Sequence, residues 1–270
     1  MGAERPRLVA IDLDGTLLRD DKAVSARTLA ALGRVQEAGA RYVVVTGRPP
    51  RYTVPTLEEI AYRGIALCAN GALTYDSIRG TVTEQRLIPA RLLPEIAGRL
   101  RTAIPGIGIA IEYTDRHVRD HFYQPGAWGG TEDDVPRLDD AELFEHDAVK
   151  LLARQPEMSA DDMVALGVPA VGELANVYHS GGNSLLEVTA AGVDKGTALA
   201  HVAAGWGIAA RDTVAFGDMF NDLPMLAWVG TSYGMANGHP DVLAKVEEVV
   251  PSNDQDGVAI TLERLFPVDR

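Results

Sequence analysis

Short apolar runs alternate with amphipathic segments at both ends of the chain. Near the start, residues 8–11 and 41–45 have the composition of buried strands, and between them Ser25 opens a stretch of helical periodicity that Gly39 closes. Near the end, the pattern predicts helices at 195–206, 221–228 and 240–246 and strands at 213–216, 230–235 and 247–250. Such alternation predicts an α/β fold with a Rossmann-like, doubly wound and mainly parallel sheet.

The middle of the chain follows a different, antiparallel pattern. Residues 107–113 and 117–122 predict one hairpin, 174–179 and 184–188 predict a second, and helices are expected near 90–103 and 159–166. A βα crossover needs only about a dozen residues, far fewer than separate Thr46 from Lys195. We therefore expect an inserted α+β cap domain at 81–189 and a core formed by 1–80 and 190–270. Within the insert, the glycine- and proline-rich segment 124–140 is expected to be a long surface loop.

The net charge of the chain limits the kinds of molecule that it is expected to bind. A net charge of −13 and a pI near 4.9 argue against binding to nucleic acid or to an anionic membrane. No apolar stretch of membrane-spanning length and no signal-peptide pattern is found, so a cytoplasmic protein is expected. A small anionic ligand stays possible because a bound divalent cation reverses the potential locally. The sequence leaves monomer and homodimer both open.

The strongest chemical signal is Asp12-Leu-Asp-Gly-Thr16, directly after the first predicted strand. In this spacing Asp12 can face a metal and a phosphorus atom while Asp14 acts on the leaving-group oxygen, and the glycine frees the turn. Mg²⁺ prefers oxygen ligands and keeps several waters, which suits a site of few carboxylates. Taken alone, the motif is equally compatible with a solvated acidic turn.

Three weaker signals fall at comparable places. Thr46-Gly-Arg48 ends the second strand and offers a hydroxyl and turn amides to phosphate oxygens, although Arg48 alone could be a surface charge. Lys195 stands at a helix start, where a cation is unfavourable unless an anion compensates it; otherwise it is an exposed lysine. Asp218 follows the strand at 213–216. Ligands of such sheets bind at the carboxyl ends of the strands, so Asp12, Thr46 and Asp218 are expected to converge.

Two further polar residues stand near the start of the helix after Asp218. Asn221 and Asp222 are placed to orient Lys195 or a metal-bound water. Asp222 is equally well explained as an acid that complements the dipole of that helix.

In this order the motifs resemble those of the haloacid dehalogenase-like hydrolases, and more narrowly the Cof-type branch, subfamily IIB. Both ends of the chain carry the resemblance, whereas the middle matches in layout only. One departure is Met235-Ala-Asn-Gly238, where relatives usually have Met-Gly-Asn-Ala. The narrower resemblance rests on four segments, Cys68-Ala-Asn-Gly-Ala72, Leu186 through Leu199, Gly217 through Leu226 and Ser252 through Ala259.

The resemblance implies roles for the motif residues. Asp12 is expected to be the nucleophile, and Asp14 the general acid and then base, protonated for the first step. Mg²⁺ is expected on Asp12, the Asp14 carbonyl and Asp218, with Asp222 at the metal or its waters. Thr46 and Lys195 are expected to bind the transferring phosphoryl group. Support for that group or for the substrate is expected from Gly47, Arg48, Asn70, Gly71 and Asn221.

The expected function is Mg²⁺-dependent hydrolysis of a small phosphorylated metabolite, a sugar phosphate or a phosphorylated cofactor. Two alternatives stay open: a phosphomutase or phosphotransferase on the same core, and a catalytically silent sugar-phosphate-binding protein. Substrate contacts in the cap could come from Glu112, His117, His121, Trp128, Tyr178, His179 and Asn183.

Overall fold

The computed structural model describes residues 5–124, 135–179, 181 and 184–268. The chain divides into two compact units. Met1–Glu84 and Asp194–Arg270 form the first, here called the core unit, and Gln85–Val193 form the second, here called the cap unit. The sequence predicts limits of 81–189 for the inserted segment. Trp128 and Asn183, and most of the loop expected at 124–140, lie outside the described residues.

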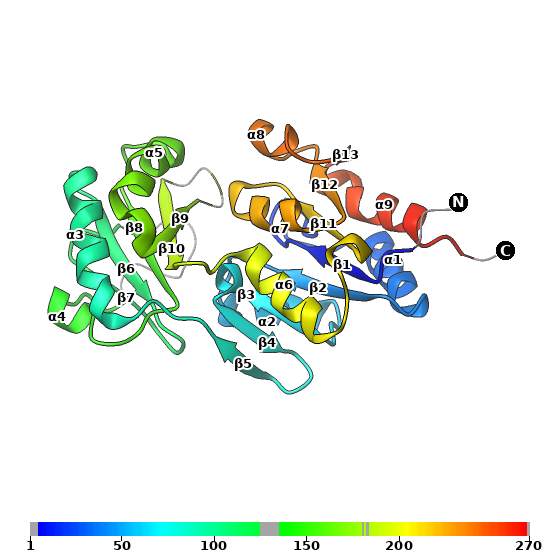
Figure 1. Ribbon diagram of the computed structural model, residues 1–270, viewed down its shortest axis with the longest axis horizontal. Helices are drawn as coiled ribbons and strands as arrows, with labels where there is room; N and C mark the ends of the chain where they lie inside the picture. The colour runs from blue at the N-terminus through cyan, green and yellow to red at the C-terminus, as the bar shows by residue number, and fades with distance from the viewer. Residues whose placement is uncertain (1–4, 125–134, 180, 182–183, 269–270) are drawn as a thin grey trace. The chain divides into compact units, whose positions relative to one another are not determined.

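The core unit is built on one eight-stranded sheet. Its order is β13-β12-β11-β1-β2-β3-β4-β5 (Figure 1). The neighbours from β13 to β3 run parallel, and β4 runs antiparallel to β3. The strands are β1 (Leu8–Ile11), β2 (Arg41–Val45), β3 (Ile65–Cys68), β4 (Leu73–Asp76), β5 (Thr81–Gln85), β11 (Thr213–Gly217), β12 (Thr231–Met235) and β13 (Glu248–Val250).

Helices cover both faces of this sheet, as expected of a doubly wound fold (Figure 1). On one face α1 packs against α9, and on the other α6 packs against α7. Alternate strand residues such as Leu8 and Val43 join Leu199 of α6 and Met225 of α7 in one buried apolar cluster. The predicted α/β class is thereby confirmed. The helices are α1 (Ala26–Glu37), α2 (Pro50–Glu59), α6 (Lys195–Gly205), α7 (Leu223–Trp228), α8 (Pro240–Leu243) and α9 (Gly257–Leu265).

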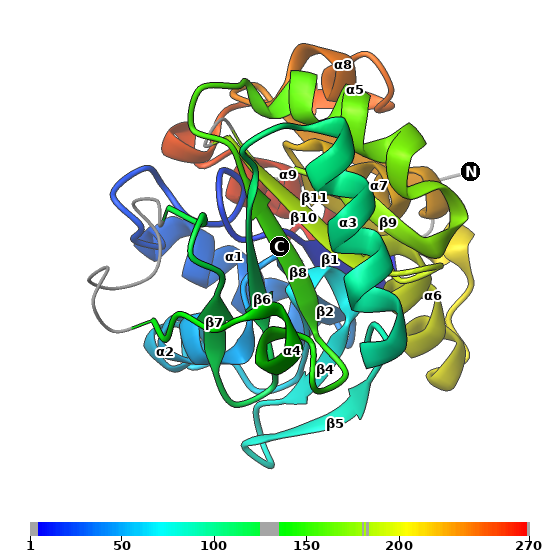
Figure 2. The ribbon, with the colours of Figure 1, turned by 90° about the vertical axis from the view of Figure 1, so that its left-hand side faces the viewer.

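The cap unit is an antiparallel sheet with helices on one face. The sheet order is β7-β6-β8-β10-β9, with antiparallel neighbours throughout. Figure 2 shows α3 and α5 against the same face, where their apolar residues meet those of the strands. The elements are α3 (Leu93–Ala103), β6 (Gly108–Glu112), β7 (His117–Arg119), α4 (Asp140–Leu143), β8 (Lys150–Arg154), α5 (Ala160–Val171), β9 (Ala175–Tyr178) and β10 (Leu185–Ala190).

The central strand β8 is absent from the predicted pattern. It pairs with β6 on one side and β10 on the other, so the two predicted hairpins are joined through it. Its first residue, Lys150, is only 5% exposed and donates from Nζ to Glu187 Oε2 at 2.5 Å. The five-residue strand has a charged residue at each end, Lys150 and Arg154, so its sequence does not resemble a buried strand. Pairing with the neighbouring strands buries it nevertheless. The sequence patterns also predict none of α2, α4, α9, β3, β4 and β5.

Two expectations about burial and membranes can be compared with the structure. Cys68 is fully buried at the end of β3, and burial raises the pKa of its thiol to about 12, as expected of an inert thiol. Within the described part of the chain, no helix is both long enough and apolar enough to cross a membrane.

We predict that Phe216→Ala lowers the free energy of unfolding by about 3–5 kcal/mol, because it leaves a cavity in the core. Phe216 is completely buried in β11 and stacks on Tyr233 with ring centroids 4.9 Å apart. Urea denaturation measures the change. Ile78→Ala is the control: Ile78 is 61% exposed, so we expect a change within about 0.5 kcal/mol. Equal changes in the two variants would contradict the prediction.

Candidate active site

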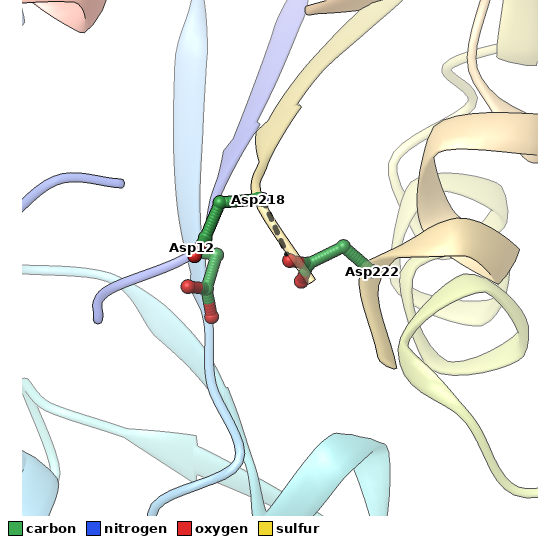
Figure 3. Close-up of side chains that lie close together, drawn as sticks. All are labelled: Asp12, Asp218 and Asp222. Atoms are coloured by element: carbon green, nitrogen blue, oxygen red, sulfur yellow. Dashed lines mark hydrogen bonds between the residues drawn. The ribbon is translucent and has the colours of Figure 1, made fainter. Parts of the chain in front are cut away.

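Parallel pairing brings three strand ends to one edge of the core sheet. Ile11, the last residue of β1, lies in register with Val44 of β2 and Phe216 of β11. The residues just beyond, among them Asp12 and Asp218, therefore adjoin. Each carboxylate of Asp12, Asp218 and Asp222 offers an oxygen within 4.8 Å of the others, and all three residues are buried (Figure 3).

A single ammonium group sits inside this acidic cluster. Lys195 is 1% exposed, and its Nζ donates to Asp12 Oδ1 at 2.6 Å and to Asp222 Oδ1 at 2.5 Å. Burial lowers the pKa of Lys195, but the two carboxylates outweigh it and raise the pKa above its ordinary value. The lysine begins α6, where Asp194 caps the helix by accepting from Thr197 N. Two carboxylates therefore compensate the lysine at this helix start, and Lys195 is not an exposed lysine; a phosphate shared with Asp12 stays a prediction.

Asp222 uses both carboxylate oxygens within the chain. Oδ1 accepts from Lys195, and Oδ2 accepts from the backbone N–H groups of Asp218 and Met219, both at 2.9 Å. Figure 3 shows the bond between Asp218 and Asp222. The residue closes the 3₁₀ turn Phe220–Asp222 and immediately precedes α7, but its side chain accepts no bond from that helix. This geometry fits the orienting of Lys195 and Asp218 better than a helix-dipole role.

Asp218 is held by the loop that follows Asp12. Its Oδ1 accepts from Thr16 Oγ1 at 2.9 Å. Gly15, with a φ of +74°, lies so close that an added Cβ would stand 2.9 Å from Asp218 Cγ, so only glycine fits there. Burial, reinforced by the charge of Asp222, raises the pKa of Asp218 to about 7. Burial likewise raises the pKa of Asp12, although Lys195 opposes the shift.

The acidic cluster therefore has one buried cation for three buried carboxylates. Oxygen donors with surplus negative charge suit a hard divalent cation such as Mg²⁺. Asp12 and Asp218 could hold such an ion, because Lys195 leaves the second oxygen of Asp12 available and Thr16 contacts one oxygen of Asp218. The residues present therefore fit the expected metal.

The Asp14 side chain belongs to a separate ion cluster. Arg48 donates two hydrogen bonds to this carboxylate, from Nε to Oδ2 and from Nη2 to Oδ1, each at 2.6 Å. Lys22 Nζ donates a third, to Oδ1, at 3.1 Å. Burial alone would raise the pKa of Asp14, but Arg48 and then Lys22 outweigh it and lower the pKa. In this arrangement Asp14 is ionised, whereas the expected first step needs it protonated.

Thr46, Asn70 and Asn221 adjoin one another beside the cluster. Asn70 N donates to Thr46 O at 2.9 Å, and Asn221 Nδ2 donates to Asn70 Oδ1 at 3.0 Å. Gly47 faces the same amide, because a Cβ there would lie 3.2 Å from Asn70 Oδ1. Thr46 Oγ1 accepts from Arg48 N at 3.1 Å. Four of the five residues predicted to support the substrate thus lie in or next to the Thr46 turn.

The fifth residue, Gly71, packs against α6. Its φ is +91°, and an added Cβ would stand 2.6 Å from the Asp194 carbonyl oxygen. Gly71 therefore lets its loop approach the end of the helix that carries Lys195. Its predicted role in substrate binding stays a prediction.

Four side chains that touch this site or its loop were not assigned a role from the sequence. Thr16 lies within the first motif, so its hydroxyl could have been assigned. Asn237 lies in the departing motif Met235–Gly238 and donates from Nδ2 to Gly15 O at 2.8 Å. Asn253 lies in the segment 252–259 and contacts the same loop. Lys22 carries no signal, because no motif or periodicity includes it.

Comparison with known proteins identifies the family. A sequence profile of the haloacid dehalogenase-like hydrolases matches residues 9–262. The relatives include the pyridoxal phosphate phosphatase YbhA of Escherichia coli K12, 28% identical over 94% of this chain and 96% of its own. They also include the 5-amino-6-(5-phospho-D-ribitylamino)uracil phosphatase YitU of Bacillus subtilis 168, 26% identical over 97% and 98% of the two chains.

Solved structures share the fold. The HAD subclass IIB sugar phosphatase BT4131 superposes with a TM-score of 0.80 at 19% identity, covering 96% of this chain and 98% of that one. SMU.1108c from Streptococcus mutans UA159 gives 0.81 at 22% identity, with the same coverage. The chain belongs to the haloacid dehalogenase-like hydrolases and is an enzyme of that family, a phosphatase. The resemblance seen in the motifs is confirmed.

We predict that Lys195→Met costs about 3–5 kcal/mol of unfolding free energy, because it leaves buried carboxylates without their cation. Urea denaturation at neutral pH measures it. The matched control is Arg264→Met, which breaks an exposed pair with Glu248 at 2.8 Å; there we expect at most about 1 kcal/mol. A loss for Lys195→Met no larger than for the control would contradict the prediction.

The raised pKa of Asp218 predicts a pH dependence of stability. A carboxyl group whose pKa rises from 3.8 to about 7 on folding binds more protons when folded. Its stabilising contribution is complete below about pH 4 and is lost as the pH rises through about 7. In chelator, the melting temperature of the wild type should therefore fall more steeply between about pH 5 and 8 than that of Asp218→Asn. Parallel melting curves for the two proteins would contradict this.

Proposed function

We propose that the chain hydrolyses phosphate monoesters of small metabolites in a Mg²⁺-dependent reaction, through an aspartyl-phosphate on Asp12. The observation that carries this proposal is the contact between Asp12 and Lys195 inside a buried carboxylate cluster. It sets a carboxylate nucleophile beside an ammonium group in a site that excludes most water. Such positioning and charge compensation supply most of the acceleration in phosphoryl transfer.

Mg²⁺ would be held by Asp12, Asp218 and the Asp14 carbonyl, and it would offset negative charge on the phosphoryl oxygens. Asp222 is predicted at the metal or its waters; we propose for it a positioning role instead, because both of its oxygens accept from Lys195 or the backbone. Asn221 and Asn70 steady the turn beside Thr46.

In the first step an Asp12 carboxylate oxygen attacks phosphorus, and the bond from phosphorus to the leaving oxygen breaks. Lys195 Nζ and the Thr46 hydroxyl contact the equatorial oxygens as charge builds up on them. Asp14 donates the proton that the leaving oxygen needs. Because Arg48 and Lys22 favour the ionised form of Asp14, they must turn toward the arriving phosphoryl anion before Asp14 can take up this proton.

In the second step Asp14, now ionised again, removes a proton from water. The resulting oxygen nucleophile attacks phosphorus, and the bond between phosphorus and Asp12 breaks. Inorganic phosphate leaves, and Asp12 is restored as a carboxylate. The two displacements replace one direct attack by water on a phosphate monoester.

The names of the relatives support a proposal for the substrate class. Their names specify pyridoxal phosphate, 5-amino-6-(5-phospho-D-ribitylamino)uracil and HMP-PP, and a solved neighbour is a sugar phosphatase. We infer for this chain a phosphorylated metabolite of similar small size, either a phosphorylated cofactor, a precursor of one, or a sugar phosphate. The identities of 26–28% do not distinguish among these.

We predict phosphate release from at least one member of a panel of phosphorylated cofactors and sugar phosphates in Mg²⁺. Both excess chelator and Asp12→Asn should lower the rate at least about a thousandfold, because one removes the cation and the other the nucleophilic charge. The matched control is Glu59→Gln, which neutralises an exposed carboxylate on α2 and should leave the rate unchanged.

Three results would overturn this proposal. Full activity of Asp12→Asn would place the nucleophile elsewhere. Turnover that requires an added bisphosphate would indicate a phosphomutase. Tight binding of a sugar phosphate without turnover in Mg²⁺ would indicate a silent binding protein.

A further inference from the structure

The loop that follows Asp12 needs external support to hold its shape. This segment, residues 13–20 and here called the nucleophile loop, carries Asp14 and the Thr16 hydroxyl that contacts Asp218. Its amides bond back toward the strand end: Leu17 N to Asp12 O at 3.1 Å and Leu18 N to Leu13 O at 2.8 Å. The carbonyl oxygens of Gly15 and Leu18 in this loop also accept hydrogen bonds from side chains elsewhere in the chain.

Two asparagines near the other end of the chain supply those donors. Asn253, which is 5% exposed, donates from Nδ2 to Leu18 O and to Asp20 Oδ1, each at 3.0 Å. Asn237 donates from Nδ2 to Gly15 O at 2.8 Å. The two residues are joined, because Asn253 N donates to Asn237 Oδ1 at 3.1 Å. Two carbonyl oxygens of the nucleophile loop thus accept hydrogen bonds from two asparagines that are hydrogen-bonded to each other.

The residues around Asn253 strengthen the same connection. Asp254 Oδ1 accepts from Asp20 N at 3.0 Å, and Asp256 Oδ1 accepts from Arg19 Nη2 at 2.8 Å. The bond to Asp254 is exposed and the bond to Asp256 is partly buried, whereas the bond from Asn253 to Leu18 O is buried. The 3₁₀ turn Asn253–Gln255 therefore faces the end of the nucleophile loop, with Asn253 as its buried residue.

We propose that Asn253, coupled to Asn237, is a positioning residue for the reaction at Asp12. Neither side chain contacts the acidic cluster, so each acts through the backbone that carries Asp14 and Thr16. An amide suits this place because it donates two hydrogen bonds without adding charge beside a carboxylate cluster. Small displacements of catalytic groups are costly to rate, so loss of this support should slow chemistry more than it weakens substrate binding.

This inference rests on the proposed function, and its test uses the full-length protein in Mg²⁺ with the active metabolite from the panel. Asn253→Asp keeps the side-chain shape but replaces the Nδ2 donor by an oxygen that faces two acceptors. We expect kcat to fall at least about tenfold and KM to change less than about threefold. Hydrogen–deuterium exchange of the peptide spanning residues 13–20 should rise in the same variant.

A second variant keeps the test decisive if Asn253→Asp folds poorly. Asn237 is exposed, so Asn237→Asp should fold normally while losing the bond to Gly15 O. We expect faster exchange in residues 13–20 and a severalfold fall in kcat. The matched control is Thr261→Val in α9, which removes a buried side-chain bond to Gly257 O at 2.9 Å away from the loop. It should leave both kcat and the exchange of this peptide unchanged.

The outcomes separate this inference from the proposed function. If the wild type releases phosphate and both asparagine variants keep kcat within about twofold, the positioning role is wrong. It is also wrong if Thr261→Val lowers kcat as much as they do. Unchanged exchange in residues 13–20 contradicts the anchoring whether or not phosphate is released. A wild type that is inactive on the whole panel instead contradicts the proposed function.

Discussion

The ammonium group of Lys195, buried between Asp12 and Asp222, is the interaction on which the rest of the site depends. An ion removed from water is stable only where opposite charges and hydrogen bonds replace its hydration. The fold meets this condition by starting α6 at the lysine, by ending β1 one residue before Asp12 and by ending a 3₁₀ turn at Asp222. Moving any of these elements would expose an uncompensated charge, so the electrostatics of the site and the packing of the core constrain each other.

The pKa values of the two carboxyl groups in the first motif are shifted in opposite directions. Burial raises the pKa of Asp12, whereas Arg48 and Lys22 hold that of Asp14 below its ordinary value despite its burial. The proposed first step needs an ionised Asp12, which the ion pair with Lys195 favours, and a protonated Asp14, which Arg48 and Lys22 disfavour. A cation beside Asp12 and a phosphoryl anion beside Arg48 would shift both groups in the required direction. Metal and substrate would thus prepare the two acids together.

Sequence patterns predicted the parts of the fold in which periodicity and burial agree. The strands before Asp12, Thr46 and Asp218 are apolar after at most one polar first residue, and their parallel pairing places the motif residues at one edge. Strand β8 was missed because its buried Lys150 is neutralised by Glu187, a partner that no local pattern reveals. Helix α5 continues to Val171 beyond the predicted 166, through Gly167 and Pro169, because its apolar face packs on β9 and β10. In each case a tertiary contact outweighed the local propensity.

The same distinction explains which site residues could be assigned. Asp12 and Asp218 follow strands, so their position is fixed by sheet geometry; the pairing of Arg48 with Asp14 depends on the conformation of two loops and could not be foreseen. The contact of Asn253 is even harder to predict from the sequence, because 235 positions separate Asn253 from Leu18, whose carbonyl oxygen accepts its hydrogen bond. The loop after Asp12 is neither a helix nor a hairpin. Its own N–H groups therefore cannot supply a hydrogen bond to every one of its carbonyl groups. Its remaining acceptors therefore need donors from other segments, and in this fold the segment after β12 and the segment before α9 supply them.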